Sequence, residues 1–395
     1  MKVVIALTSS SGQLSGVQRH AVNLARCLLT REQITAVHLI AAPWQQEFVH
    51  DAAPRGDARL HLHTALVRNT SLSRNLWYYA QLPKIAAQLG ADIVHLAYPA
   101  PLNERAYRCP TVVSLHDLYP YDVPQNFGFP KALFNQLVLQ QCLRAANAIA
   151  CVSRTTLARL ESMEPRLALA KATAIYNCVE PQSCISDSGP LPDWSGESFL
   201  LCVAQHRRNK NILFLLRIFE RLLRAGQFAA GTRLVILGIP GPETHAIRRF
   251  ISKKGIVANV LLLNGLSEQE LQWCYRNCEV LLAPSLVEGF GLPVAEALLA
   301  GCRVICSDIP AFRELGGNHC VYIPLNAAAE QVFSHAICAA IRKRAPKPVA
   351  LPQLSAPFIA EQYLQLYQSL LLRAPALDGS ALSASIPTSE GNHIL

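Results

Sequence analysis

The sequence predicts an α/β protein with two domains, each built on a doubly wound parallel sheet. Short apolar runs alternate with helical patterns along both halves of the chain, which is typical of successive strand and helix units. A length of 395 residues suits two domains, each large enough for its own core. Residues 280–306 are expected to form strand, loop, helix and strand, an arrangement found in parallel sheets.

The composition indicates a folded protein without a membrane span. Apolar residues make up 51% of the chain and charged residues only 16%, which argues against disorder. No run of 18 uncharged apolar residues appears, so we expect no transmembrane helix. The apolar start, residues 3–7, is too short for a signal peptide and favours a first strand. We therefore expect a cytoplasmic protein.

The formal net charge of +9 could reflect nucleic acid, a membrane surface or an anionic substrate. No Lys/Arg cluster with interleaved aromatic residues and no nucleic-acid motif is present, so we do not expect a nucleic-acid partner. Attraction to anionic lipid head groups at the inner face of a membrane, or to a phosphate-bearing substrate, is the favoured explanation.

The thirteen cysteines do not have the pattern of a disulfide framework or of a zinc site. Their number is odd, they are scattered, and most stand in apolar surroundings. Neither Cys274-x3-Cys278 nor Cys302-x3-Cys306 has the spacing of a zinc ribbon. We expect buried thiols in a reducing compartment, with no metal and no cofactor.

The first half is expected to carry its polar ligands after its strands. We expect strands at 2–7, 91–95, 111–117 and 148–152, and helices at 18–29 and 132–145. A small-residue loop, 8–17, has the composition of one that approaches a phosphate, although such loops are common. His95 and His116 fall at strand ends, where open α/β sheets bind ligands; for His95 a structural role is as good an explanation. The Pro- and aromatic-rich segment 119–131 either faces an acceptor or is an ordinary surface connection.

The second half is expected to repeat this organisation after a polar linker rich in Pro and Gly. The predicted divisions are an N-terminal domain at 1–180, a linker at 181–198, a C-terminal domain at 199–356, a returning helix at 357–373 and a disordered tail at 374–395. After the strand 199–204, Arg207, Arg208 and Lys210 lie in a turn that leads to a helix at 212–225. Three cations at such a turn could bind a diphosphate, or simply form a solvated loop.

The most informative stretch follows the strand 280–283. Glu288 lies in a loop with Gly289, Phe290 and Gly291, whose backbone N–H groups a ligand can approach closely. Pro293 suits a first helical residue and places Glu296 in the first turn, beside the positive end of the helix dipole. Two carboxylates with backbone donors suit a ligand rich in hydroxyls, such as a sugar or ribose. The helix dipole alone could also explain Glu296.

This stretch resembles the signature of a known family. Residues 284–297, Pro-Ser-x-x-Glu-Gly-Phe-Gly-Leu-Pro-x-x-Glu-Ala, are similar to the motif of the retaining GT-B glycosyltransferases of family four, the glycosyltransferase group 1. Glu288 and Glu296 match its Glu-x7-Glu pair, and His116 with Asp117 matches its His-Asp pair near the sugar. Gly16 matches the second glycine of its Gly-Gly loop, where Ser15 departs from the first.

Two further motifs match the family only in part. Lys210-Asn211 match its Lys-Asn pair, but Gln205 replaces the arginine five residues before the lysine. We expect Arg207 or Arg208 to supply that second cation. Residues 177–180, Asn-Cys-Val-Glu, stand where the family has Asn-Gly-Val-Asp.

The resemblance implies two Rossmann-like domains facing across a cleft, with no cofactor besides the co-substrate. Because no Asp-x-Asp stands at a strand end and cations line the proposed phosphate site, we expect a metal-independent reaction. A hexose would move, with retention, from a nucleotide-diphosphate sugar of the GDP-mannose or UDP-sugar type to a glycan, lipid-linked or polysaccharide acceptor. Glu288 would hold the donor sugar, His116 would lie near the reacting carbon, and Glu296 would hold the ribose. The remaining donor-binding candidates are Gly16, Arg207, Arg208, Lys210, Gly289, Phe290, Gly291 and Leu292.

Two other functions stay open at this stage, because a fold does not determine a function. A non-catalytic nucleotide-sugar-binding partner would fit the departures at Gln205 and Cys178, whereas the intact Glu288, Glu296 and His116 argue against it. A glycoside phosphorylase or a sugar-nucleotide epimerase could use the same fold.

Overall fold

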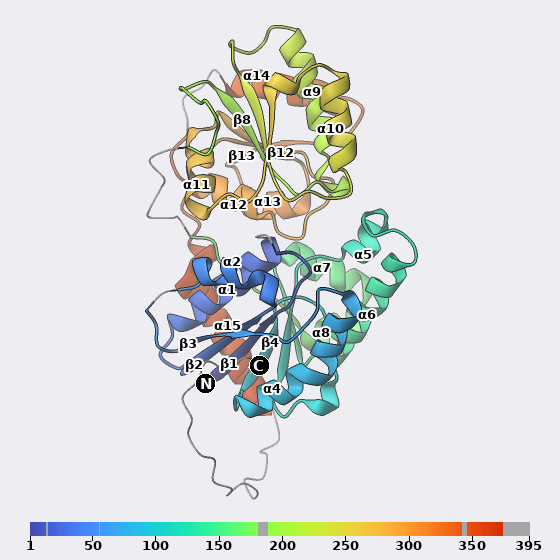
Figure 1. Cartoon of the computed structure of the whole chain (residues 1–395), viewed down its shortest axis with the longest axis vertical. Coiled ribbons are helices and arrows are strands. Elements are labelled where there is room, and N and C mark those ends of the chain that lie inside the picture. Colours follow the sequence, from blue (N-terminus) through green and yellow to red (C-terminus); the bar gives the residue numbers. More distant parts are fainter. Residues whose placement is uncertain (13–14, 55, 181–188, 342–345, 374–395) are drawn as a thin grey trace, which may run out of the picture.

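The computed structural model describes residues 1–12, 15–54, 56–180, 189–341 and 346–373, and Figure 1 shows them as two α/β domains stacked along the long axis of the molecule. Each domain is a parallel sheet with helices on both faces. Every strand pairing within these described ranges is parallel. The predicted fold class is confirmed.

The N-terminal sheet has seven strands in the order β3-β2-β1-β4-β5-β6-β7. Its strands are β1 Lys2–Leu7, β2 Ala36–Ala41, β3 Leu60–Thr64, β4 Ile93–Leu96, β5 Thr111–Leu115, β6 Ala148–Cys151 and β7 Ala172–Ala174. The order reverses between β1 and β4, and such a switch point leaves a crevice outside the carboxyl ends of the strands. The loop after β1 and the residues after β4 and β5 therefore lie where a ligand is expected.

Helices cover both faces of this sheet. They are α1 Gly16–Leu29, η1 Pro43–Gln45, α2 Gln46–Ala52, α3 Ser71–Leu76, η2 Trp77–Gln81, α4 Leu82–Gln88, η3 Glu104–Ala106, α5 Tyr119–Asp122, η4 Pro124–Asn126, α6 Lys131–Ala145, α7 Arg154–Met163 and α8 Pro165–Lys171. One core cluster joins α1 to one face of the sheet. A second joins η2, α4 and α6 to the other face.

The C-terminal sheet has six strands in the order β10-β9-β8-β11-β12-β13. Its strands are β8 Phe199–Val203, β9 Arg233–Leu237, β10 Val260–Leu263, β11 Val280–Ala283, β12 Val304–Ser307 and β13 Cys320–Ile323. Here the order reverses between β8 and β11. The cationic turn after β8 and the two-glycine loop after β11 thus lie side by side at the second switch point.

The helices of this domain pack on two further apolar clusters. They are η5 Arg208–Lys210, α9 Ile212–Arg224, α10 Thr244–Lys253, η6 Val257–Asn259, α11 Glu268–Asn277, α12 Leu292–Leu299, α13 Pro310–Gly316, α14 Ala329–Ala340 and η7 Pro352–Leu354, and they are followed by α15 Ala356–Arg373. Helix α15 returns to the N-terminal domain, where Tyr363 and Tyr367 are buried in the same cluster as Leu24 and Leu28 of α1.

Two local expectations need correction. Helix α12 begins at Leu292 rather than Pro293, because Gly291 forms its N-cap with a φ of 106° that only glycine adopts readily. Glu296 consequently lies in the second turn and not the first. Part of the expected linker also belongs to a domain: Leu191 is buried and the Trp194 ring meets Trp273 edge-on at 4.8 Å. The rest of the linker, 181–188, and the expected disordered tail, 374–395, lie outside the described residues.

The state of the cysteines and the character of the helices in the described part can be compared with what the sequence predicted. All twelve cysteines that the structure describes are free thiols, and most are buried. Across the same described ranges, none of the helices combines the length and the apolar content that crossing a bilayer requires.

Candidate active site

The two switch points meet where the Gly289 loop lies against the end of β5. A Cβ atom on Gly289 would come within 1.7 Å of the His116 carbonyl oxygen, so only glycine allows this approach of the two backbones. The hydroxyls of Ser153 and Thr156 donate to the Gly289 carbonyl at 2.5 and 3.0 Å. Residues of the N-terminal domain therefore hold this loop of the C-terminal domain in place.

Glu288 lies in an ion pair at this contact. Its carboxylate accepts hydrogen bonds from Lys210 Nζ at 2.5 and 2.7 Å, and from the Tyr119 hydroxyl at 3.1 Å. The side chains of Lys210 and Glu288 are 18% and 10% exposed. Two residues assigned separately from the sequence are thus direct partners, in a position where water screens their charges poorly.

Asp117 completes the charged group. Burial raises the pKa of its carboxyl to about 6, while the Tyr119 N–H bond and the cations Arg207 and Lys210 act in the opposite direction. Arg207 is near enough to influence both Asp117 and Tyr119, whereas the Arg208 side chain is exposed. Of the two arginines, Arg207 is therefore the one whose charge acts on Asp117.

His116 is held neutral with a defined tautomer. Its Nε2 lies 2.8 Å from the Ala97 carbonyl oxygen, which can only accept, so Nε2 carries the proton and Nδ1 offers a lone pair. Burial lowers the pKa of His116 to about 4. A neutral imidazole of this kind can accept a hydrogen bond from a sugar hydroxyl.

A buried chain of hydrogen bonds lies behind His116. His20, whose ring meets His116 edge-on at 4.8 Å, bonds to Asn177 Oδ1 and Ser114 Oγ at 2.7 Å each. Ser114 Oγ also bonds to His95 Nε2 at 2.7 Å, and His95 Nδ1 bonds to the hydroxyl of Tyr367 at 2.5 Å.

Asn177, at one end of this chain, determines which group donates in each hydrogen bond. Because Asn177 Oδ1 can only accept, a neutral His20 is protonated on Nδ1 and takes the Ser114 proton on Nε2. Ser114 then accepts from His95, which in turn accepts from Tyr367. His95 is thus a structural residue that joins β4 to α15.

Glu296 is already paired across the domain interface. Its carboxylate accepts from Arg19 Nη1 at 2.5 Å and from the Tyr275 hydroxyl at 2.7 Å. A second ion pair joins Arg19 Nη2 to Glu268 at 2.6 Å. Arg19 belongs to α1, so one cation of the N-terminal domain bridges two carboxylates of the C-terminal domain.

The first turn of α1 faces the first turn of α12. A Cβ atom on Gly16 would meet Leu292 Cδ1 at 3.6 Å, and Gln18 Oε1 accepts from the Ser15 N–H at 2.6 Å, which stabilises the start of α1 at Gly16. Two helix N-termini with partial positive charge therefore meet here, and Lys210 lines one pocket with Pro293 and Val294 of α12. Such an arrangement suits a diphosphate.

Phe290 and Gly291 hold this loop in shape. The Phe290 ring is buried, and a Cβ atom on Gly291 would come within 2.9 Å of the Phe312 ring. These two residues therefore act through packing in this structure, while their backbone belongs to the loop before α12.

Sequence reasoning missed the partners Arg19, Tyr119, Tyr275 and Glu268. One signal for Arg19 was present: a cation near a helix N-terminus opposes the helix dipole, which calls for a nearby acid or anion. Among the residues that the structure describes, no group of three His, Cys, Asp or Glu side chains is placed to hold a metal ion.

Family models match both domains of the chain. The model described as Glycosyltransferase Family 4 matches residues 14–183, and the model described as Glycosyl transferases group 1 matches residues 191–331. Together they cover every strand of the two sheets except β1, and the whole candidate site. This protein is a family 4, group 1 glycosyltransferase.

Two curated relatives of this glycosyltransferase match along most of its length. The O-antigen chain mannosyltransferase B of Escherichia coli is 22% identical over 331 residues, covering 80% of this chain and 85% of the relative. The GDP-mannose:cellobiosyl-diphosphopolyprenol alpha-mannosyltransferase of Xanthomonas oryzae pv. oryzae is 24% identical over 355 residues, covering 85% and 88%.

A solved structure supports the fold of this glycosyltransferase. The crystal structure of Anabaena HepE in complex with UDP and glucose superposes with a TM-score of 0.60 at 16% identity, covering 94% of this chain and 96% of that chain. The two parallel-sheet domains facing one another have the GT-B arrangement, as expected.

Proposed function

We propose that this glycosyltransferase moves mannose from GDP-mannose, with retention of configuration, to a glycan acceptor carried on a lipid diphosphate or a growing polysaccharide. The observation that supports the proposal is the contact of the His116 backbone with the Gly289 loop, which brings the candidate residues of both domains together. GDP-mannose is preferred over a UDP-sugar because two relatives that match most of the chain are named mannosyltransferases.

In this proposal the cations serve the leaving group. The bond from the anomeric carbon to the diphosphate breaks, a bond to an acceptor oxygen forms, and the acceptor proton leaves with the diphosphate. Lys210, Arg207 and the N-termini of α1 and α12 stabilise the charge that develops on the departing diphosphate. Donor binding releases Glu288 and Glu296 from Lys210 and Arg19, so that they can meet the hydroxyls of the sugar and the ribose.

The proposal includes a place of action. Nucleotide sugar is drawn from the cytoplasm, and a lipid-linked acceptor is met at the inner face of the membrane. Retention is supported by the similarity of residues 284–297 to the motif of retaining enzymes, and NMR of the product tests it. An α-linked mannoside from GDP-α-mannose supports retention, whereas a β-linked product contradicts it.

Donor identity can be tested directly with a panel of nucleotide sugars. We expect GDP-mannose to raise the melting temperature most, because a ligand at 100 times its Kd adds about 2.7 kcal/mol to the free energy of unfolding. A transfer assay with a glycan on a lipid diphosphate should then consume that same donor. A stronger shift with UDP-glucose would replace the proposed donor.

The same assay separates the other functions. Donor binding without turnover, with every acceptor tried, would favour a non-catalytic partner. Phosphate-dependent release of a sugar phosphate would indicate a phosphorylase, and conversion of the free donor into its epimer would indicate an epimerase.

We also propose that no metal ion is needed for turnover, because Lys210 and Arg207 already supply cations to the diphosphate. Activity should therefore persist in EDTA at the level of the untreated enzyme. Complete loss of turnover in EDTA, with recovery on adding magnesium or manganese, would contradict this prediction.

A further inference from the structure

One outer surface of the N-terminal domain exposes many large apolar side chains. Helices α3, α4 and α6, with η2, cover the same face of the sheet and bury Trp77, Leu82 and Leu139 beneath them. Their outer sides and adjoining loops leave apolar groups exposed. These are Leu66 (67%), Leu72 (71%), Leu76 (56%), Tyr79 (45%), Phe129 (91%), Leu133 (51%), Phe134 (50%) and Leu137 (56%).

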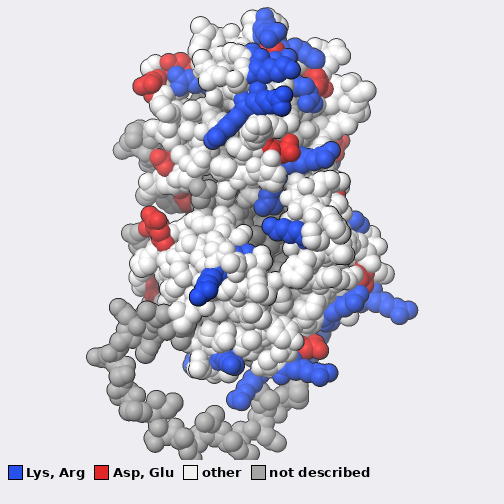
Figure 2. Space-filling model, turned by 45° about the vertical axis from the view of Figure 1, so that its right-hand side comes forward, with Lys and Arg blue, Asp and Glu red and all other residues white. Residues whose placement is uncertain are grey.

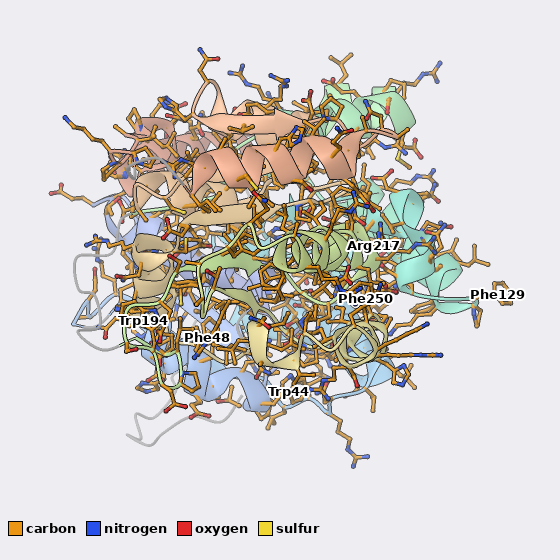
Figure 3. The ribbon with its side chains drawn as sticks, turned by 90° about the horizontal axis from the view of Figure 1, so that it is seen from above. Trp44, Phe48, Phe129, Trp194, Arg217 and Phe250 are labelled. Atoms are coloured by element: carbon orange, nitrogen blue, oxygen red, sulfur yellow. The ribbon has the colours of Figure 1, made fainter. Side chains whose placement is uncertain are left out.

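Because of their spacing, these residues form stripes along the helices instead of being scattered over the surface. Leu133 and Leu137 lie one turn apart on α6, with Phe134 beside them, and Leu72 and Leu76 have the same spacing on α3. Phe129 projects from the body of the molecule ahead of α6 (Figure 3). Soluble proteins rarely leave so much apolar surface open without a partner.

Cations surround these stripes almost without acids. The segments 65–90, 100–110 and 124–147 contain seven Lys and Arg and one acid, Glu104. The cations are Arg68, Arg74, Lys84, Arg105, Arg108, Lys131 and Arg144, of which Arg144 pairs with Glu164 at 3.3 Å. Figure 2, in which the side bearing α5 and α6 comes forward, shows blue side chains over the lower domain with few red ones among them. This surface therefore attracts anions as well as apolar groups.

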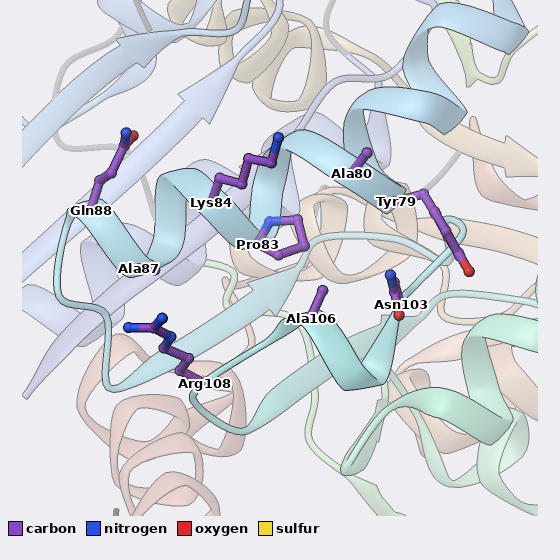
Figure 4. A pocket seen from close by; sticks show the side chains of 9 residues that line it. All are labelled: Tyr79, Ala80, Pro83, Lys84, Ala87, Gln88, Asn103, Ala106 and Arg108. Atoms are coloured by element: carbon purple, nitrogen blue, oxygen red, sulfur yellow. The ribbon is translucent and has the colours of Figure 1, made fainter.

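A groove of about 710 Å³ lies on this same surface between α4 and η3. Lys84 of α4 and Arg108 after η3 stand on its opposite walls, with Tyr79 and Asn103 at one end (Figure 4). Both cations are exposed, and neither belongs to a salt bridge within the described residues. The groove has the size and charge for a phosphate-bearing head group.

We propose that this surface, formed by α3, α4, η3 and α6, docks the enzyme on an anionic lipid bilayer. Phe129 and the α6 stripe enter the interface, the surrounding cations contact lipid phosphates, and the groove takes one phosphate head group. Apolar stripes flanked by cations match the two layers of a bilayer surface, which is apolar inside and anionic at its face. The inference rests on the proposed function in one respect: a lipid-linked acceptor is presented at a bilayer.

The surface is connected to the reaction site. Tyr119, which bonds to Glu288, begins the segment that runs through α5 and η4 to Phe129. Asn126 of η4 also bonds to Asn209 of the C-terminal domain at 3.1 Å. Docking through Phe129 and α6 thus brings the bilayer beside the loops that line the cleft.

Vesicle flotation with the full chain tests the proposal. Vesicles of phosphatidylcholine alone are compared with vesicles that also contain phosphatidylglycerol, and we expect the protein to float with the second kind. Phe129→Asp with Leu133→Asp should weaken that binding by about tenfold or more, as expected for losing two buried apolar side chains. Lys84→Gln with Arg108→Gln should weaken it by about tenfold, because each cation near an anionic surface contributes.

Matched controls lie on the other domain. Val257→Asp introduces a charge at a position that is 65% exposed, and Arg249→Gln with Lys253→Gln removes two exposed cations of α10. Neither control should change vesicle binding. The affinity for the donor, measured by calorimetry, should stay unchanged in all these variants. A wrong proposal about vesicle binding can therefore be told apart from a wrong assignment of the donor.

Three results would overturn the inference. The protein could float equally with both kinds of vesicle, or the surface variants could bind as well as the parent. The protein could also ignore vesicles and form a dimer that Phe129→Asp dissociates, which would assign the surface to a second copy of the chain.

Discussion

The charged residues of the cleft satisfy one another in this structure. Glu288 pairs with Lys210 and Glu296 with Arg19, both at 2.5 Å. Removing one partner of such a pair leaves a poorly hydrated charge behind, and this costs more than the pair itself contributes. Substitutions here therefore act on a partner as well as on the ligand, and the choice of replacement decides what an experiment measures.

The two glutamates should separate in kinetics. Glu288→Gln keeps the size and one acceptor but loses the charge beside the reacting sugar, so kcat should fall by about 100-fold or more. Its donor Kd should change little. Glu296→Gln should weaken donor binding by roughly 10- to 100-fold, since ribose hydroxyls are bound alike in ground and transition states.

Measuring kcat and donor Kd for both variants decides this prediction. Both variants should remain folded, because Gln can still accept hydrogen bonds from Tyr119 and Tyr275. Circular dichroism checks this. Turnover of Glu288→Gln at the parent rate would remove this carboxylate from the reacting centre.

Asp117 should give donor binding a pH dependence. Its pKa is raised to about 6 by burial, so the carboxyl is neutral below that pH and becomes an anion above it. An anion beside Glu288 and the donor diphosphate repels the ligand. Donor affinity should therefore fall as the pH rises through about 6, and the affinity of Asp117→Asn should change less over that range. Identical calorimetric pH profiles for the parent and Asp117→Asn would contradict this.

At the scale of elements, three contacts hold the two domains together around the cleft, in addition to those of Tyr119 with Glu288 and of Asn126 with Asn209. The Gly289 loop rests on the end of β5, and α1 reaches α11 and α12 through Arg19. In the third contact Glu314 of α13 accepts from the backbone N–H groups of Arg154 and Thr155, at 2.7 and 2.9 Å. A carboxylate at the N-terminus of α7 satisfies unpaired donors and complements the helix dipole.

Gly289→Ala should block the closed arrangement without unfolding either domain. The new methyl group would overlap the His116 carbonyl, and neither backbone can shift while Ser153 and Thr156 hold the loop. The domains should move apart, with kcat lower by about 100-fold, because misplacing reacting groups by an ångström costs that much. Small-angle scattering should show a larger radius of gyration. A variant with the parent's radius and rate would show that this contact is not needed.

At the scale of the whole molecule, α15 ties the C-terminal end of the described chain into the N-terminal core. The chain of hydrogen bonds from Tyr367 to Asn177 joins α15, β4, β5 and α1. Its two histidines are buried and neutral. Such a network is stabilising only while every member keeps its partner.

Acid should therefore destabilise the protein before its carboxylates are protonated. Burial lowers the pKa of His95 to about 3 and of His116 to about 4, and that of His20 well below its ordinary value. The unfolded chain, with histidine pKa values near 6.5, then binds more protons than the folded one. The stability these histidines contribute is complete above about pH 6.5 and is lost as the pH falls toward 4.

Each histidine adds up to about 1.4 kcal/mol per pH unit to this loss. Asp117 has the opposite effect on stability, because its raised pKa favours the folded state at low pH. It is a single group, whereas three histidines lose stability as the pH falls. Urea unfolding between pH 7 and 4.5 measures the slope. A free energy of unfolding that stays constant over this range would contradict the prediction.

Much of the fold could be predicted because the signals are local. The apolar strands β1 and β11 begin and end where the sequence pattern placed them, and Gly301 ends α12 in a left-handed conformation with a φ of 76°. The start of α12 was misplaced by one residue because Pro293 tolerates either of the first two helical positions. Spacing alone did not show whether Arg207 or Arg208 acts on Asp117, because neighbouring residues of a turn point in different directions.

The sequence by itself determined the motif that bears Glu288 and Glu296, because a strand, a glycine loop and a helix follow from residues within about one motif length. Only the tertiary structure decided their partners. Arg19 stands 277 residues before Glu296, and Tyr119 stands 169 before Glu288. No local pattern encodes such a pair, because it forms only when two separately folded sheets close on each other. The approach of the Gly289 and His116 backbones has the same origin.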